Sequence, residues 1–188
     1  MRKIIQFNMI SLDGFFAGPN GDINWHRTDD EFNHFAIEQT GAAGGLIFGR
    51  ITYELMASYW PTPAALADDP QVTEIMNSKP KYVVSRTLQQ ANWHNTRLIR
   101  SNLVPEMQQL KQQPGSDLFV FGSANLAATL IEHSLIDEYR LLIAPLVLGI
   151  GMPCFPGMRA PQTLKLISSR TFQNGNVLLT YQHDPNQG

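Results

Sequence analysis

The sequence predicts an α/β fold in which helices cover both faces of a mixed, mostly parallel sheet. Residues 46–48, 82–84 and 118–121 are continuously apolar, as in strands buried on both faces of a parallel sheet. Helical patterns alternate with these strands, which is typical of a three-layer α/β arrangement. Near the end, Asn174-Gly175 separates two further strand patterns, and this dipeptide favours a tight antiparallel hairpin. We therefore expect a parallel core with an antiparallel C-terminal edge.

The individual elements follow from the same patterns. Apolar residues recur at helical spacing in 29–40, 51–58, 103–112 and 124–133. Thr28 and Glu31 fit a capping box at the start of the first helix, and Asn102 is a possible cap of the third. The prolines between Tyr59 and Pro70 predict a long irregular connection. The expected strands are 4–10, 45–48, 81–85, 118–121, 139–144, 163–172 and 176–183.

Composition limits the possible classes of protein. The chain has 188 residues, a hydrophobic fraction of 43% and a formal net charge of −2, which suits one domain over residues 1–183 with a disordered tail at 184–188. The charge is balanced, which argues against nucleic acid as a partner. No apolar run reaches the roughly 20 residues of a membrane helix. A lone cysteine argues against disulfides and favours the cytoplasm. Five histidines without metal-ligand spacing argue against a metal site.

Polar turns follow three of the inner strands at the point where each strand ends, and the first and third of them contain a glycine. Ligands of open α/β sheets bind outside the carboxyl ends of the strands. A helix start follows the first and third turns, and its free N–H groups attract phosphate. Two hydroxyls around one arginine in the second turn suit a phosphate monoester. The residues are Gly49, Arg50 and Thr52 in the first turn, Ser85, Arg86 and Thr87 in the second, and Gly122, Ser123, Ala124, Asn125 and Leu126 in the third.

Each turn taken alone also fits an ordinary loop. The first could be a simple strand–helix turn with Arg50 at the surface, and the second a polar loop with Arg86 in solvent. The third could be a helix that Ser123 caps. Three such turns on adjacent buried strands together favour a phosphate-rich, nucleotide-like ligand.

Two aspartates stand near the opposite end of the expected site. Asp13 lies in a glycine-hinged segment, 11–18, that could be a mobile lid or a plain turn stabilised by the aspartate. Asp30 follows Trp25 at the start of the first helix. It either helps to initiate that helix or offers its carboxyl group for a proton or a substrate N–H.

The order of these motifs resembles the dihydrofolate reductase superfamily. The motifs are Ser-Leu-Asp-Gly at 11–14, Trp25, Gly-Arg-x-Thr-Tyr-Glu at 49–54, Val-Ser-Arg-Thr at 84–87 and Phe-Gly-Ser-Ala-x-Leu at 121–126. The segments 135–141 and 145–149 are similar to the branch that contains the C-terminal reductase domain of the bifunctional riboflavin-biosynthesis deaminase–reductase. The resemblance spans roughly residues 3 to 182 and implies a dihydrofolate reductase-like fold.

The resemblance also implies NADPH as the cofactor. The first turn would hold its phosphates from one side, the second its adenosine 2′-phosphate, and the third its pyrophosphate from the other side. Trp25 and Asp30 would bind a small-molecule substrate, and Asp30 and Asp13 are the candidate catalytic residues. Relatives of this kind commonly pair, so a homodimer is expected.

The implied activity is hydride transfer from NADPH to a small pterin- or pyrimidine-like substrate, as in 5-amino-6-(5-phosphoribosylamino)uracil reductase. The alternatives are dihydrofolate reduction proper and a non-catalytic NADPH-binding regulatory protein. The chain carries no zinc deaminase domain, and the stretch after Thr52, Tyr-Glu-Leu-Met-Ala-Ser-Tyr-Trp, departs from the riboflavin reductases. The resemblance therefore supports the cofactor more strongly than the substrate.

Overall fold

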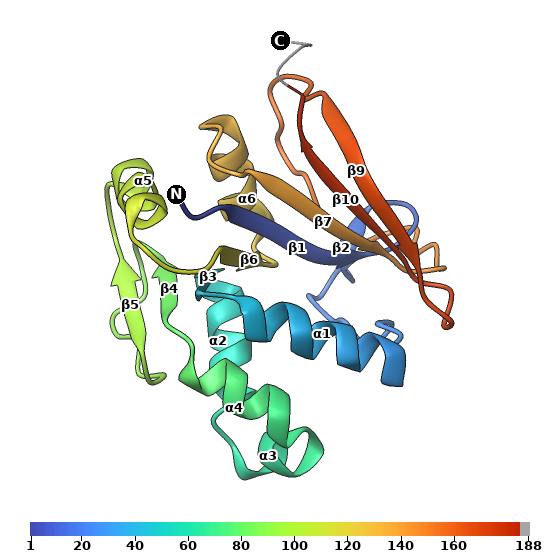
Figure 1. Ribbon diagram of the computed structural model, residues 1–188, viewed down its shortest axis with the longest axis horizontal. Coiled ribbons are helices and arrows are strands. Elements are labelled where there is room, and N and C mark those ends of the chain that lie inside the picture. Colours follow the sequence, from blue (N-terminus) through green and yellow to red (C-terminus); the bar gives the residue numbers. More distant parts are fainter. Residues whose placement is uncertain (185–188) are drawn as a thin grey trace.

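An eight-stranded sheet forms the centre of the molecule, in the strand order β5-β4-β3-β6-β1-β7-β10-β9 (Figure 1). The structure, a computed structural model, describes residues 1–184, so residues 185–188 of the predicted tail lie outside the described residues. A short pair, β2 and β8, forms a second sheet next to β1. The strands are β1 (Ile4–Ile10), β2 (Phe15–Ala17), β3 (Gly45–Gly49), β4 (Lys81–Val84), β5 (Thr96–Ile99), β6 (Leu118–Phe121), β7 (Glu138–Ile143), β8 (Met152–Pro153), β9 (Leu164–Thr171) and β10 (Val177–His183).

The sheet is mixed, as predicted. Neighbouring strands from β5 through β7 are parallel, whereas β10 pairs antiparallel with both β7 and β9. The turn between β9 and β10 closes with a hydrogen bond of 2.8 Å from the N–H of Phe172 to the carbonyl of Asn176. Gly175 in this turn has φ +88°, a conformation that glycine adopts without steric cost.

Helices cover both faces of the sheet, so the three predicted layers are present (Figure 1). One face packs against α5 and α6 through a core that includes Met107 and Leu130. The other packs against α2 and α4 through Phe48, Tyr53 and Met76, and against α1 near β1, β7 and β10. The helices are α1 (Asp30–Ala42), α2 (Arg50–Tyr59), α3 (Pro63–Asp68), α4 (Pro70–Ser78), α5 (Leu103–Gln112) and α6 (Ala124–Glu132). Among the described residues, no helix has the length and apolar character needed to cross a membrane.

The predicted irregular connection from Tyr59 to Pro70 is wrong, because it contains α3 and the start of α4. Thr62 accepts a hydrogen bond from the N–H of Ala65 and caps α3, and Asp69 accepts one from Val72 and caps α4. A proline follows each cap at the start of its helix. Proline suits this position because the first helical N–H has no partner within the helix.

The predicted capping box of the first helix is also wrong, by one position. Asp29, not Thr28, is the cap, and its carboxylate accepts the N–H of Phe32 at 2.8 Å. Glu31 reaches across the fold instead, to the N–H of Gln173 and the guanidinium of Arg170. The other helix boundaries agree with the prediction to within two residues, but Asn102 makes no side-chain cap.

Three strands were not predicted. β5 combines Thr96 and Arg97 with only two apolar residues, so its pattern resembles a loop. β2 and β8 pair with each other, and β8 has only two residues, including Pro153. These short strands depend on partners distant in sequence, which no local pattern reports.

Candidate active site

The carboxyl ends of the parallel strands lie along one edge of the sheet. β4, β3, β6 and β1 are consecutive neighbours there, so the turns that follow them lie side by side. The three predicted turns belong to β4, β3 and β6, and the segment that contains Asp13 follows β1. The sheet therefore brings the predicted site residues to one edge.

The first and third turns touch. Ser123 Oγ accepts the N–H of Gly49 at 2.7 Å and lies 2.9 Å from Thr52 Oγ1. A Cβ atom on Gly49 would lie 2.6 Å from Ser123 Oγ, and one on Gly122 would lie 3.0 Å from Thr52 Oγ1. The glycines are therefore needed for the two turns to meet at this distance.

The helices that begin at these turns have no side-chain caps. α1, α3 and α4 are capped by Asp29, Thr62 and Asp69, whereas neither α2 nor α6 has a side-chain hydrogen bond at its start. The prediction that Ser123 caps α6 is wrong, because its φ is +55° and its hydroxyl contacts the first turn instead. The first N–H groups of α2 and α6 therefore remain available to an anion.

The third uncapped helix, α5, differs in its charge. Its cap residue Asn102 has φ +56°, and Glu106 places a carboxylate in the first turn. α5 therefore has its own acidic side chain near its start, which α2 and α6 lack. Ala124, Asn125 and Leu126 form the first turn of α6, and the side chain of Leu126 is buried in the core. Leu126 can therefore offer a ligand only its backbone.

The second turn is stabilised by hydrogen bonds to the side chain of its own first residue, Ser85. Ser85 is buried, and its hydroxyl oxygen accepts the N–H groups of Thr87 and Leu88 at 3.2 and 2.9 Å. This arrangement exposes Arg86 and Thr87. Across residues 1–184, no acidic side chain pairs with Arg86, whereas Arg50 forms an ion pair of 2.9 Å with Glu54. Arg86 is thus a cation at this edge that no described carboxylate neutralises.

Asp13 joins the loop after β1 to the loop after β7. Its carboxylate oxygens accept the N–H groups of Leu148 and Gly149 at 3.1 and 2.7 Å. The Leu12 N–H also donates to Leu146, and β2 pairs with β8. We call these two segments, residues 11–17 and 145–154, the flap.

The environment of Asp13 favours the ionised form. A hydrogen bond from the Ser11 side chain and the N–H groups of Gly149 and Leu148 lower the pKa of Asp13 to about 2. A carboxylate held in this way has no proton to give near neutral pH. The geometry is that of a loop anchor, and proton transfer by Asp13 stays a prediction.

Trp25 and Asp30 lie on the face of the sheet that α1 covers. Trp25 is half-buried and packs in a cluster with Met9 of β1 and Phe172. Its Nε1 atom is buried and has no hydrogen-bond partner among residues 1–184. Asp30 is exposed in the first turn of α1. Trp25 thus lies close to the second half of β1, and the roles of Trp25 and Asp30 toward a substrate stay predictions.

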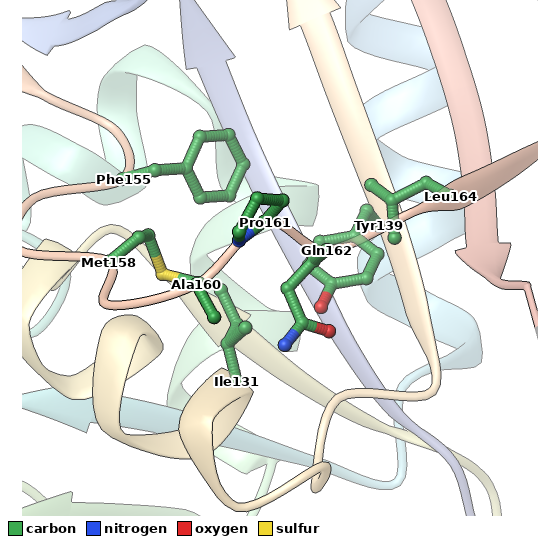
Figure 2. A pocket seen from close by; sticks show the side chains of 8 residues that line it. All are labelled: Ile131, Tyr139, Phe155, Met158, Ala160, Pro161, Gln162 and Leu164. Atoms are coloured by element: carbon green, nitrogen blue, oxygen red, sulfur yellow. The ribbon is translucent and has the colours of Figure 1, made fainter. Parts of the chain in front are cut away.

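An apolar pocket and a larger groove are also present among the described residues. Figure 2 shows an apolar pocket of about 220 Å³ whose lining includes Ile131, Tyr139 and Phe155. Ile131 is in the last turn of α6, at the opposite end from Ser123. A larger groove of about 760 Å³ lies between α2 and the segment 88–94. The apolar pocket is therefore separate from the three predicted turns.

A family model described as the RibD C-terminal domain matches residues 2–178. The chain belongs to the RibD C-terminal domain family. A relative of this RibD C-terminal domain is uncharacterized protein YyaP of Bacillus subtilis (strain 168). The two are 33% identical over 180 residues, which cover 96% of this chain and 94% of the relative.

Solved structures share the fold of this RibD C-terminal domain. One is a putative riboflavin biosynthesis protein from Shewanella sp. PV-4, with a TM-score of 0.73, 22% identity, and coverage of 97% of this chain and 99% of the other. Another is a dihydrofolate reductase from Enterococcus faecalis complexed with NADP(H), with a TM-score of 0.65 and 14% identity. That match covers 97% and 96% of the two chains. The predicted dihydrofolate reductase-like fold is thus confirmed.

One buried residue of the RibD C-terminal domain escaped the sequence analysis. Asn8 lies on β1 and is only 4% exposed, and its Oδ1 accepts the N–H of Gly122 at 2.9 Å. A polar side chain inside the apolar run 4–10 could have been noticed, because buried polar groups need partners. Its partner is 114 residues away in sequence, and no local pattern identifies it.

Proposed function

We propose that this protein is an NADPH-dependent reductase that transfers hydride to a C=N or C=O bond of a small heterocyclic substrate. The observation that carries the proposal is the meeting of two uncapped helix starts, α2 and α6, at the edge that also presents Arg86. Such an edge suits a ligand with several phosphates. Membership of the RibD C-terminal domain family and the likeness to a reductase that binds NADP(H) support the same conclusion.

The chain's own groups fit the phosphates of such a cofactor. The first N–H groups of α2 and α6, with the hydroxyl of Thr52, would hold the pyrophosphate. Arg86 and Thr87, exposed beside the buried Ser85, would hold the 2′-phosphate. A glycine at 49 and at 122 keeps the two turns in contact, so the site is formed before a ligand binds.

The nicotinamide ring, when bound, supplies the hydride. At the reacting end the chain would orient the substrate and exclude water, with Trp25 as one wall and the flap as another. Hydride transfer to carbon leaves a negative charge on the adjacent nitrogen or oxygen, which takes a proton. Asp30 is exposed and would pass that proton from solvent. The homodimer and the cytoplasmic location stay predictions from the sequence.

The test is a titration of NADPH and NADH against the wild type and Arg86→Ala. Loss of a charged hydrogen-bond partner costs about 1.5–3 kcal/mol, so we expect NADPH affinity to fall about ten- to a hundredfold and NADH affinity to change little. Arg97→Ala is the matched control, because Arg97 lies on β5 and pairs with Glu106. Equal NADPH affinity in wild type and Arg86→Ala, with no preference over NADH, would contradict the role of Arg86.

A further inference from the structure

The side chain of Asn8 contacts two parts of the molecule that lie far apart in the sequence. Its Oδ1 accepts the N–H of Gly122 at 2.9 Å, and its Nδ2 donates to Cys154 Sγ at 3.3 Å. Because a backbone N–H can only donate, the contact with Gly122 fixes which end of the amide faces which partner. Both ends of the Asn8 amide are therefore in use, and the side chain is held in one orientation.

On one side, Asn8 supports the turn that meets α2. Gly122 and Ser123 have φ values of +57° and +55°. Glycine adopts this conformation without steric cost, whereas a serine keeps it only when its surroundings hold it. The bond from Gly122 to Asn8 is one such constraint, and the bond from Gly49 to Ser123 is the next. Asn8 is thus linked through two hydrogen bonds to the first turn.

On the other side, Asn8 reaches the flap through Cys154. Cys154 is 1% exposed, and its N–H donates to the carbonyl of Gly14 at 2.9 Å. Asp13, next to Gly14, holds Leu148 and Gly149. These bonds join the two loops of the flap, so the loops would move together. Because Cys154 belongs to the flap, such a movement would break its contact with Asn8.

We propose that Asn8 is a positioning residue that couples the phosphate-binding turn at Gly122 to the flap, so that a bound nucleotide phosphate holds the flap closed, with its residue Cys154 buried against Asn8. The inference rests on the proposed function for its ligand. Phosphate bound at the start of α6 stabilises the left-handed turn, and the turn in that state favours the Asn8 contact with Cys154. Coupling of this kind is reciprocal, so a closed flap also strengthens phosphate binding.

Cys154 supplies the measurement, because it is the one cysteine of the chain. Burial raises the pKa of its thiol to about 11, and a protonated, buried thiol does not react with disulfide reagents. The rate at which dithiodipyridine labels the native protein therefore reports how often the flap opens.

The experiment compares labelling with no ligand, with NADPH and with 2′-phospho-ADP-ribose, which carries the same phosphates but no nicotinamide ring. Binding of each nucleotide is measured separately by calorimetry. We expect both nucleotides, at saturation, to slow labelling of the wild type by about fivefold or more, the range typical of coupled sites. Protection by the ligand without the ring shows that the effect passes through the phosphate turn.

A matched pair of variants then tests Asn8 itself. Gln6 is also buried on β1, and its Nε2 lies 3.8 Å from Cys154 Sγ, but it has no bond to Gly122. Both Asn8→Leu and Gln6→Leu remove a buried amide beside Cys154. We expect Gln6→Leu to keep the protection by 2′-phospho-ADP-ribose and Asn8→Leu to lose it while still binding the nucleotide.

The outcomes separate the two proposals. Failure of both nucleotides to bind overturns the proposed function and this inference together. Binding without protection of the wild type, or protection by NADPH alone, overturns only the coupling. Equal protection in Asn8→Leu and wild type does the same. If Asn8→Leu does not fold, hydrogen exchange of the Leu148, Gly149 and Cys154 amides in the wild type decides, because exchange unchanged by 2′-phospho-ADP-ribose contradicts the coupling.

Discussion

Gly122 combines a left-handed backbone with a close neighbour, and both features exclude a side chain. Its φ is +57°, and an added Cβ would lie 3.0 Å from Thr52 Oγ1. We expect Gly122→Ala to lose about 1–2 kcal/mol of unfolding free energy from the backbone alone. We also expect weaker NADPH binding, because the crowding separates the two turns that would hold the phosphates. Denaturant titration and calorimetry measure the two effects.

Gly157→Ala is the control for that variant. Gly157 has a similar φ of +66°, but a Cβ there would meet no atom within 4 Å. It should lose a comparable amount of stability and bind NADPH like the wild type. Equal NADPH affinity in the Gly122 and Gly157 variants would contradict a role for the turn contact in binding.

Lys81 is fully buried, and its ammonium group binds carbonyl groups at the C-terminal end of α4. The Nζ atom donates to the carbonyls of Met76, Asn77 and Lys79 at 2.9, 3.0 and 2.8 Å, and lies 4.4 Å from the Trp93 ring centroid. Burial lowers the pKa of Lys81 to about 8. We expect Lys81→Met to lose about 1–3 kcal/mol of unfolding free energy, since it leaves buried carbonyls without a donor.

Lys79→Met provides the comparison for Lys81→Met. Lys79 is partly exposed, and its ammonium group donates to the single carbonyl of Gly41. Its loss should change the unfolding free energy by about 0.5 kcal/mol or less, as surface substitutions usually do. Denaturation curves of both variants at pH 7 measure the difference, and equal stability would contradict the structural role of the buried ammonium.

At the scale of the elements, the sequence predicted what depends on local chemistry. β6 is a continuous apolar run and β1 is mostly apolar, so both strands were predicted with their observed ends. α3 and α4 were missed because Pro63 and Pro70 were interpreted as helix breakers, although proline is favoured at the first helical position. β5 was missed because its pairing with β4 stabilises it more than its own composition does.

The candidate site, like the fold, was predictable from the sequence only where it depends on local chemistry. The residue types and strand-end positions of the three turns were visible in the sequence, because glycine, hydroxyl and arginine residues after buried strands favour a phosphate ligand. The contact between Ser123 and Gly49 was not, since it depends on the strand order and on the left-handed backbone of Ser123. The alternative interpretation, in which Ser123 caps its own helix, was wrong because the sequence does not show the left-handed backbone at this residue.

At the scale of the whole molecule, acidic side chains hold segments that are distant in sequence. Asp13 joins the two loops of the flap, and Glu31 joins α1 to the end of the β9–β10 hairpin. Glu138 is buried on β7 and pairs with Arg140 and Lys3. The net charge of −2 therefore hides an uneven arrangement, in which many charged side chains are paired within the fold while Arg86 is exposed.

These three carboxyl groups make the fold sensitive to acid. Burial raises the pKa of Glu138, but hydrogen bonds and charge from Arg140 and Lys3 outweigh it, so the net shift is downward. The N–H of Gln173 and the guanidinium of Arg170 lower the pKa of Glu31, and that of Asp13 falls to about 2. A carboxyl group with a lower pKa in the folded state binds protons less tightly than it does in the unfolded chain.

The unfolding free energy contributed by these groups is therefore fully present above about pH 4.5, the ordinary glutamate value, and is lost as the pH falls through the folded-state pKa values. The slope is about 1.4 kcal/mol per pH unit for each extra proton that the unfolded chain binds. Urea titrations between pH 2 and 7 measure it.

We expect Glu138→Gln to be less stable than the wild type at pH 7 and to lose less stability on acidification. Glu74→Gln, an exposed change on α4, should follow the wild-type curve. An acid slope in Glu138→Gln as steep as that of the wild type would mean that the Glu138 ion pairs add nothing to stability.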